Sequence, residues 1–457
     1  MSTVKVNKIT PRTCNSIQLG ESGDTLTIPS GATLQNCGTA TGFGLSFCTT
    51  TKTSPFTATA GKGFFINTGS AVTVTLPASP SVGNEVIVVD STGQAACNAI
   101  TLGRNGSKIK GGCQDLLMTT NRGGLRIVYS GSSQGWVTAT AGNDATMQPA
   151  FITATGGTES TSGDFKIHTF TSDGTFTVSK LAVASANNKV SYIVVAGGGS
   201  GAPSQGCVGT SGGGAGGFRE GRNSPVDTYT ASPLAAADSG LTVTASAFPV
   251  TVGAGGTAGA ITYPNSKGVN GSNSIFSTIT SAGGGFGTGG GAPGPSGTQV
   301  PGGPGGSGGG GGTCGNSGSS ADPGGTGNTP PVSPAQGTNG GSGAAAAANN
   351  GGGGGGATAS GTNGTSPGGC GGAGATTNIT GSPVAYAGGG GGGNSPSYAS
   401  TGGTGGGAAG KTRSSGAAAN AGTVNTGGGG AGSSGTPSNT AGGLGGSGVV
   451  IIRYKFQ

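Results

Sequence analysis

The chain has 457 residues, of which 109 are glycine, 31% are hydrophobic and 7% are charged. This length allows about three domains, but the low hydrophobic content argues against the core of a conventional enzyme, so we expect no catalytic activity and no cofactor. The formal net charge of +7 includes no basic block, and the eight cysteines lack metal-ligand spacing. These features argue against a nucleic-acid partner and a metal site.

Residues 1–45 contain only short strand-like pieces, such as TLTI at 25–28. Each piece is too small to bury a core alone, so we interpret 1–45 as an N-terminal shaft segment that needs other copies of the chain. The predicted assembly is a homotrimer with intertwined N-terminal strands. No apolar signal region is present, which predicts a protein that is made in a cytoplasm and stays there or leaves without a conventional signal.

A β-domain is predicted at about 46–142. Its strands are marked by strict alternation or by apolar runs with polar ends, and they are expected at 71–76, 85–90, 125–129 and 135–137. Asn105-Gly106 is a hairpin signal. The basic stretch around it, 104–110 with Arg122 and Arg126 downstream, is interpreted as a solvated hairpin, with contact to an anionic surface as the alternative.

Residues 143–163 are interpreted as a connector, and 164–457 as a glycine-rich C-terminal domain. Strands are predicted at 165–170 and 175–178. Two β-branched runs, 191–196 and 449–456, stand on either side of the glycine tract and have the length of buried strands. We expect them to lie in one small β-core, so that everything between them leaves the core and returns to it.

Residues 283–448 consist largely of glycine runs, such as 308–312 and 351–356, separated by short loops. Such a composition is typical of disorder, but the strands on either side favour an ordered body. A chain in the extended threefold helix rises about 3.1 Å per residue and points its N–H and C=O groups outward. Several such helices can pack closely where no Cβ intervenes. We therefore predict an all-β chain whose C-terminal domain packs polyglycine-II-like helices on a small β-core.

Three apparent motifs give little support for a functional site. Residues 193–202 fit a strand followed by GxGxxA, with Glu220 as the acid, but 203–217 is too glycine-rich for the helix that a dinucleotide site needs. His168 is the only histidine, which excludes a histidine relay within one subunit; three copies could share a metal on a trimer axis, but a strand-surface position is our prediction. Asp322 is the only carboxylate after residue 239, which excludes a paired-carboxylate hydrolase there.

Several segments carry a family resemblance. The sequence reads STVKVNKITPR at 2–12, LGESGDTLTIPSGA at 19–32, HTFTSDGTF at 168–176, YIVVAGGG at 192–199 and GSGVVIIRY at 446–454. The first two resemble the opening of tail-fibre and related structural proteins of marine tailed bacteriophages, notably cyanophages. The last three resemble the borders of the glycine-rich C-terminal domain of those proteins, and the region from 73–77 to 135–137 is similar to one of their β-modules.

This resemblance implies a non-enzymatic, homotrimeric virion fibre, assembled in the host cytoplasm. Its N-terminus would join tail or baseplate proteins, and its C-terminus would meet a host surface polysaccharide or outer-membrane protein. In composition alone, the glycine-rich domain is similar to the adhesin at the fibre tips of some T-even-like phages. A non-adhesive head, neck or decorating fibre remains an alternative. A glycine-helix ice-binding or cell-surface structural protein is a further one, although the β-rich N-terminal half argues against ice binding.

If glycine rods run back and forth from a β-core, their connecting loops alternate between the two ends of the bundle, and about every second loop can face a receptor. Aromatic and charged groups, which grip sugars and protein surfaces, are scarce in this region. The receptor-contact candidates are Phe286, Tyr386, Tyr398, Lys411 and Arg413. Packing across the bundle surface is the alternative role for each tyrosine.

Overall fold

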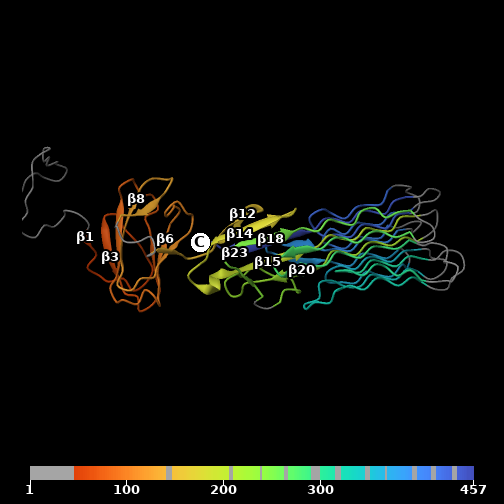
Figure 1. Ribbon diagram of the computed structural model, residues 1–457, viewed down its shortest axis with the longest axis horizontal. Helices are drawn as coiled ribbons and strands as arrows, with labels where there is room; N and C mark the ends of the chain where they lie inside the picture. Colours follow the sequence, from red (N-terminus) through yellow and green to blue (C-terminus); the bar gives the residue numbers. More distant parts are fainter. Residues whose placement is uncertain are drawn as a thin grey trace, which may run out of the picture.

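A computed structural model gives the architecture of this chain. The structure describes residues 46–139, 147–204, 209–236, 239–261, 266–289, 299–313, 321–344, 350–365, 368–393, 399–412, 418–434 and 440–457. Figure 1 shows an elongated molecule with a β-domain at one end, a second β-core in the middle and long glycine runs that extend away from that core. The described residues are all-β apart from one 3-10 turn, η2 (Ser185–Asn188). The predicted trimeric shaft at 1–45 lies outside the described residues.

The β-domain consists of two five-stranded sheets. One has the order β1 (Ser46–Phe47), β3 (Lys62–Ile66), β5 (Glu85–Asp90), β8 (Gly124–Tyr129) and β9 (Trp136–Thr138). The other has the order β10 (Met147–Pro149), β7 (Leu116–Met118), β6 (Ile100–Gly103), β4 (Val72–Thr75) and β2 (Phe56–Thr57). Successive strands β3 to β6 alternate between the two sheets, so within each sheet they pair in parallel. The predicted strands of this domain are confirmed, and β5 has the predicted bounds.

The two sheets close on one apolar core, in which the single tryptophan, Trp136, is fully buried. In β4 and β5 alternate residues point inward, as the period of two in a strand requires. Val86 and Val88 of β5 pack into this core, and Asp90 is the third inward residue. Ile87, which lies between the two valines, is half-buried on the outer face. Only one side of this apolar run therefore faces the core.

Asp90 is only 3% exposed and organises the loops beyond β5. Its carboxylate accepts a hydrogen bond from the Thr68 hydroxyl at 2.7 Å and further ones from the backbone N–H groups of Thr92, Gly93, Ala95 and Arg122. Burial raises the pKa of this carboxyl, but the hydrogen bonds outweigh burial and lower the pKa to about 2. The ionised side chain thus holds two loops against the end of the strand.

The second β-core packs two further sheets against each other. One has the order β11 (Thr153–Thr155), β14 (Gly174–Lys180), β18 (Ala247–Thr251), β19 (Ser274–Phe276) and β20 (Ile279–Ser281). The other has the order β12 (Thr158–Ser162), β13 (Phe165–Phe170), β23 (Val449–Lys455), β15 (Lys189–Val195) and β16 (Phe218–Gly221), with β17 (Leu241–Thr242) also on β15. Side chains from both sheets share one apolar cluster.

The prediction that the two apolar runs at the ends of the glycine tract lie in one β-core is confirmed, and the structure shows that they also pair. Strands β15 and β23 are adjacent and antiparallel, with Val195 opposite Val449. Almost every residue of both strands is buried, which is why they read as continuous apolar runs without alternation. After β15 the chain returns to this sheet at β16 and β17, and after the glycine runs it returns once more at β23.

The stretch interpreted as a connector, 143–163, contains strands among its described residues. This stretch supplies β10 to the β-domain and β11 and β12 to the second core. All three are edge strands, and β12 is composed of Thr, Glu and Ser with four of its five residues exposed. Edge strands of this kind are held by backbone hydrogen bonds, so they lack the apolar pattern by which strands are recognised. No helix among the described residues is long and apolar enough to cross a membrane.

Candidate functional site

The glycine-rich region is a bundle of runs joined by backbone hydrogen bonds, and the run 350–357 shows the pattern. The N–H groups of Gly351 and Gly354 donate to the carbonyls of Gly393 and Gly390, three residues apart on one neighbouring run. The next two pairs of donors follow the same rule: Gly352 and Gly355 donate to Gly311 and Gly308, and Gly353 and Gly356 donate to Thr362 and Ala359. Every third residue therefore bonds to the same neighbour.

The Cα faces of this run approach three other neighbours with the same period. A Cβ on any glycine from 351 to 356 would come within 3.0 Å of backbone atoms, closer than real Cβ atoms approach. Each neighbouring run is met by two glycines that are three residues apart. The residues approached are Thr210 and Gly213 on the first run, Gly341 and Thr338 on the second, and Cys370 and Gly372 on the third. These three neighbours donate hydrogen bonds to the carbonyl groups of 351–356, and the first three accept hydrogen bonds from its N–H groups, so six stretches of chain surround this one. Glycine is required here because the backbones themselves are in contact.

Small hydroxyl residues replace glycine inside the bundle where a backbone carbonyl oxygen can accept a hydrogen bond from the hydroxyl. The Ser211 hydroxyl, which is fully buried, lies 2.8 Å from the Thr288 carbonyl oxygen and 2.6 Å from that of Gly310. The Ser307 hydroxyl donates to the Gly356 carbonyl oxygen at 3.1 Å. The bundle is therefore a polar body with few apolar side chains, stabilised mainly by hydrogen bonds.

At the base of the bundle a buried ion pair joins β23 to the loop that follows β16. Arg453 Nε lies 3.1 Å from both carboxylate oxygens of Asp227, and the two residues are 5% and 2% exposed. The Ser191 hydroxyl donates to the same carboxylate at 2.8 Å. Arg453 also donates to the Ile379 carbonyl at 3.2 Å and lies 4.2 Å from the ring centroid of Phe165. A lone arginine in the apolar run 449–456 was the available sequence signal for such a buried partner.

Glu220, the acid of the apparent dinucleotide motif, serves packing in the same region. It is 4% exposed and accepts hydrogen bonds from the Tyr229 hydroxyl at 3.0 Å, the Ser232 N–H at 2.9 Å and the Thr377 hydroxyl at 2.5 Å. Burial and the neighbouring carboxylate raise the pKa of Tyr229, so its hydroxyl remains a donor. The glycines of the motif bond to other runs of the bundle; Gly199 N, for example, donates to Gly214 O at 2.8 Å.

His168 is fully buried, so the predicted strand-surface position is wrong. Its Nδ1 lies 2.6 Å from the Gly156 carbonyl oxygen and its Nε2 3.3 Å from the Tyr454 hydroxyl. The ring stacks on Tyr454 and meets Phe176 edge-on, between the two sheets of the core. This position also removes the imidazole from any surface on which three copies could share a metal. The alternation of residues along β13 could not predict that His168 is buried, because this strand lies inside the sheet, between β12 and β23.

Lowering the pH below about 6.5 is expected to destabilise the glycine-rich domain through His168. Burial lowers the pKa of this imidazole below its ordinary 6.5. Between the lowered value and 6.5 the unfolded chain therefore binds a proton that the folded chain does not, and the free energy of unfolding falls as the pH falls. Urea unfolding from pH 8 to pH 5 should show this slope, and it should be shallower for His168→Phe.

The β-domain contains no histidine and serves as the internal control for this measurement. Its unfolding transition should not change with pH between 8 and 5 in the way that the glycine-rich domain does. Equal slopes for the parent chain and His168→Phe would contradict the assignment of the effect to this residue.

The structure separates the receptor-contact candidates. Phe286 is half-buried, with Lys267 Nζ 5.4 Å from its ring centroid, and Lys411 is half-buried on another run. Tyr386 ends β22 (Val384–Tyr386), which pairs with β21 (Ala375–Thr377) beside the β-core; it is 6% exposed, and burial raises its pKa to about 12. Tyr386 therefore packs into the apolar cluster beside the β-core. Tyr398 and Arg413 lie outside the described residues.

Among the described residues, no group of three or more His, Cys, Asp or Glu side chains is placed to hold a metal. The buried charged groups at the bundle base already have protein partners: Arg453 pairs with Asp227, and Glu220 accepts hydrogen bonds from neutral groups. These contacts stabilise the join between strands and runs. No curated protein matches the chain. Residues 171–455, from the turn after β13 to the end of β23, match the family described as a glycine-rich domain. That match covers more than half of the chain, and the protein therefore belongs to the glycine-rich domain family.

Proposed function

We propose that the glycine runs are polyglycine-II-type helices packed side by side. The support is a period of three, found in 351–356 both in the hydrogen bonds and in the close backbone approaches, which is the number of residues per turn in this helix. Six surrounding stretches are what close packing of parallel rods requires. In this arrangement each residue exchanges its hydrogen bonds with other runs, and the bundle is rigid without a hydrophobic core.

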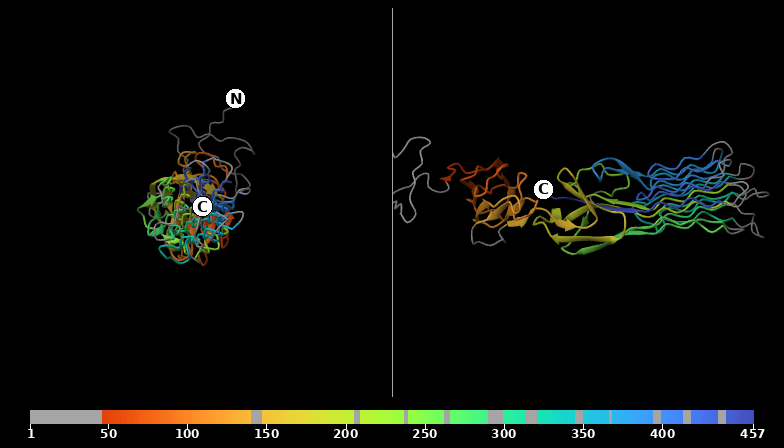
Figure 2. Two further views of the ribbon diagram at one scale, coloured as in Figure 1. Left: turned by 90° about the vertical axis from the view of Figure 1, so that its right-hand side faces the viewer. Right: turned by 90° about the horizontal axis from the view of Figure 1, so that it is seen from above.

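We infer that the chain is a non-enzymatic fibre protein of a tailed-phage virion, whose glycine-rich domain contacts the host cell surface during adsorption. One observation carries this proposal: the molecule has two different ends. Figures 1 and 2 place β1, where the described chain begins, at one end, and the glycine runs extend from the β-core to the opposite end. A rigid rod with one end available for attachment and the other for contact suits an adhesion fibre.

The proposed partners are tail or baseplate proteins at the N-terminus and a host polysaccharide or outer-membrane protein at the far end. The homotrimer is proposed from the composition of 1–45. Both described β-cores are closed by strands of a single chain, so trimer contacts would come from 1–45 or from outer surfaces. Assembly in the host cytoplasm and a final place in the virion follow from the same proposal.

We propose that recognition lies in the short stretches that interrupt the runs. By sequence, nine such stretches fall outside the described residues, and they contain Tyr263, Tyr398 and Arg413. Lys411 lies two residues before one of them, 413–417. These side chains supply the aromatic and cationic groups that the glycine runs lack, and such groups contribute much of the binding energy of recognition surfaces.

The test is adsorption of particles that carry an altered fibre. Replacing 394–398 and 413–417 by Gly/Ser sequence should lower adsorption to host cells at least about tenfold, because aromatic and cationic side chains contribute much of the binding free energy. A tenfold loss corresponds to about 1.4 kcal/mol of binding free energy. The matched control changes Ser382 to Gly and Pro383 to Ser in the exposed β21–β22 turn beside the β-core, and it should adsorb normally. Normal adsorption by the first variant, with the fibre intact, would overturn these contacts and favour a non-adhesive virion fibre.

A further inference from the structure

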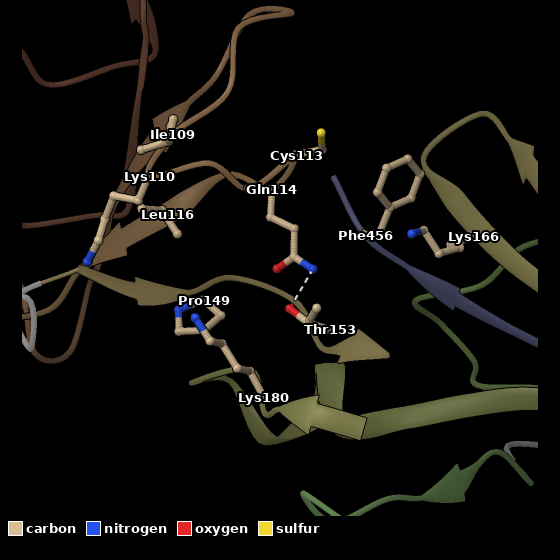
Figure 3. A pocket seen from close by; sticks show the side chains of 11 residues that line it. Ile109, Lys110, Cys113, Gln114, Leu116, Pro149, Thr153, Lys166, Lys180 and Phe456 are labelled. Carbon is tan, nitrogen blue, oxygen red and sulfur yellow. Dashed lines mark hydrogen bonds between the residues drawn. The ribbon is translucent and has the colours of Figure 1, made fainter. Parts of the chain in front are cut away.

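A pocket of about 360 Å³ lies where the β-domain meets the second β-core. Figure 3 shows Ile109, Lys110 and Leu116 on one side of it, Lys166 and Phe456 on the other, and Lys180 with Pro149 below. The lining residues thus come from both halves of the molecule. The volume falls in the lower part of the range of small-molecule sites, about 300–1,000 Å³.

The charged groups that line this pocket are all cationic. Lys110, Lys166 and Lys180 contribute to its walls, and no Asp or Glu does. Lys166 Nζ lies 3.0 Å from Glu159 and 5.8 Å from the Phe456 ring centroid, so its position is held from two sides. Lys180 ends β14 and is exposed. The pocket walls thus carry lysines and no carboxylate, which favours an anionic ligand.

The remaining walls combine apolar surface with one oriented amide. Leu116, Pro149 and the half-buried ring of Phe456 supply the apolar part. The Gln114 amide nitrogen donates to the Ile152 carbonyl at 2.8 Å and to the Thr153 hydroxyl at 3.0 Å, which fixes the side chain. No hydrogen bond to Gln114 Oε1 is formed by the described residues, so this oxygen can accept one from a ligand hydroxyl.

We propose that this pocket binds a uronic-acid unit of an acidic saccharide. A pyranose ring packs its C–H face on an aromatic ring, its hydroxyl groups suit the Gln114 oxygen, and its carboxylate suits the lysines. Lysine recognises an anion as a point charge, whereas phosphate recognition often uses the arginine fork, and no arginine lines this pocket. The inference rests on the pocket alone and does not depend on the proposed host contact at the far end.

Binding here would also brace the junction between the two halves. Arg104 Nη2 of the β-domain donates to Gln457 Oε1 at 2.5 Å, and the Gln114 amide reaches β11. A saccharide that touches both walls adds contacts that exist only when the halves keep this arrangement, so it stabilises the junction by mass action.

Cys113 makes the proposal measurable in the unaltered protein. This cysteine lines the pocket and is exposed, whereas Cys97 is exposed and does not line it. The alkylation rates of both thiols can be followed by peptide mass spectrometry with tri-glucuronic acid, with maltotriose and with sodium sulfate at matched ionic strength. At about ten times its Kd, tri-glucuronic acid should slow alkylation of Cys113 about tenfold and leave Cys97 unchanged.

Lys180→Gln should weaken this protection, and Lys62→Gln, which changes an exposed lysine of β3 away from the pocket, should not. Equal protection by sulfate would show a site for simple anions and would overturn the saccharide assignment. Protection by maltotriose would overturn the role of the charge. No protection of Cys113 by any of the three would overturn the site, whereas the adsorption experiment tests the far end separately.

Discussion

Replacing Gly354 by valine is expected to unfold the glycine bundle while the β-domain stays folded. A Cβ at this position would come within 3.0 Å of backbone atoms of Gly213 and Gly214, so the neighbouring run has no side chain to move aside. The Gly354 N–H also donates to the Gly390 carbonyl at 2.8 Å. Overpacking usually costs about 1–3 kcal/mol; here two backbones must separate and lose their hydrogen bonds, so we expect a loss at the upper end of that range or beyond.

Thermal unfolding followed by limited proteolysis gives the measurement. The glycine-rich domain should be cleaved rapidly in Gly354→Val, and the transition of the β-domain should be unchanged because it has its own core. Ala409→Val is the matched control, since it places the same valine side chain on an exposed residue of the bundle. Equal protease resistance of the two variants would contradict the proposed packing of rods.

The sequence predicted most of the strands that carry a strong local pattern. Two of them, β5 and β13, have the predicted bounds, because apolar β-branched residues between polar ends have few other stable conformations. A shared core for β15 and β23 was also predictable, although the two strands are far apart in the chain. A glycine tract between two buried strands has to start and end at one sheet if both strands share a core.

The features that could not be predicted depend on which surface covers a residue. His168 and Tyr386 are both polar-tipped aromatic residues that the local pattern allows on a surface, and both are buried by segments distant in sequence. The edge strands β10 to β12 lack an apolar pattern because backbone pairing holds them. The junction pocket is built from several elements between Ile109 and Phe456, and no local motif marks any of them.

The same long-range dependence applies to the whole glycine-rich domain through β23. This strand is central in its sheet, with β13 on one side and β15 on the other. Until it is in place, the inner edges of both neighbours lack partners, and the run that returns to the core has no anchor. Pairing of β15 with β23 joins residues about 250 positions apart, which makes this closure costly in entropy and slow.

A chain truncated after Gly448 is therefore expected to keep a folded β-domain and to lose the glycine-rich domain entirely. Burial of the apolar side chains of β23 stabilises the fold by roughly 1.5–3 kcal/mol for each large residue. The buried residues are Val449, Val450, Ile451, Ile452 and Tyr454. Their combined contribution is comparable to the net stability of a typical domain, about 5–15 kcal/mol, and the hydrogen bonds to two neighbouring strands are lost with them.

Differential scanning calorimetry of the truncated chain should show only the β-domain transition, whereas deletion of Gln457 alone should leave both transitions. A peptide of residues 449–457 added in trans should restore part of the lost transition if the slot between β13 and β15 is the missing element. An unchanged second transition in the truncated chain would mean that the bundle holds itself together without its central strand.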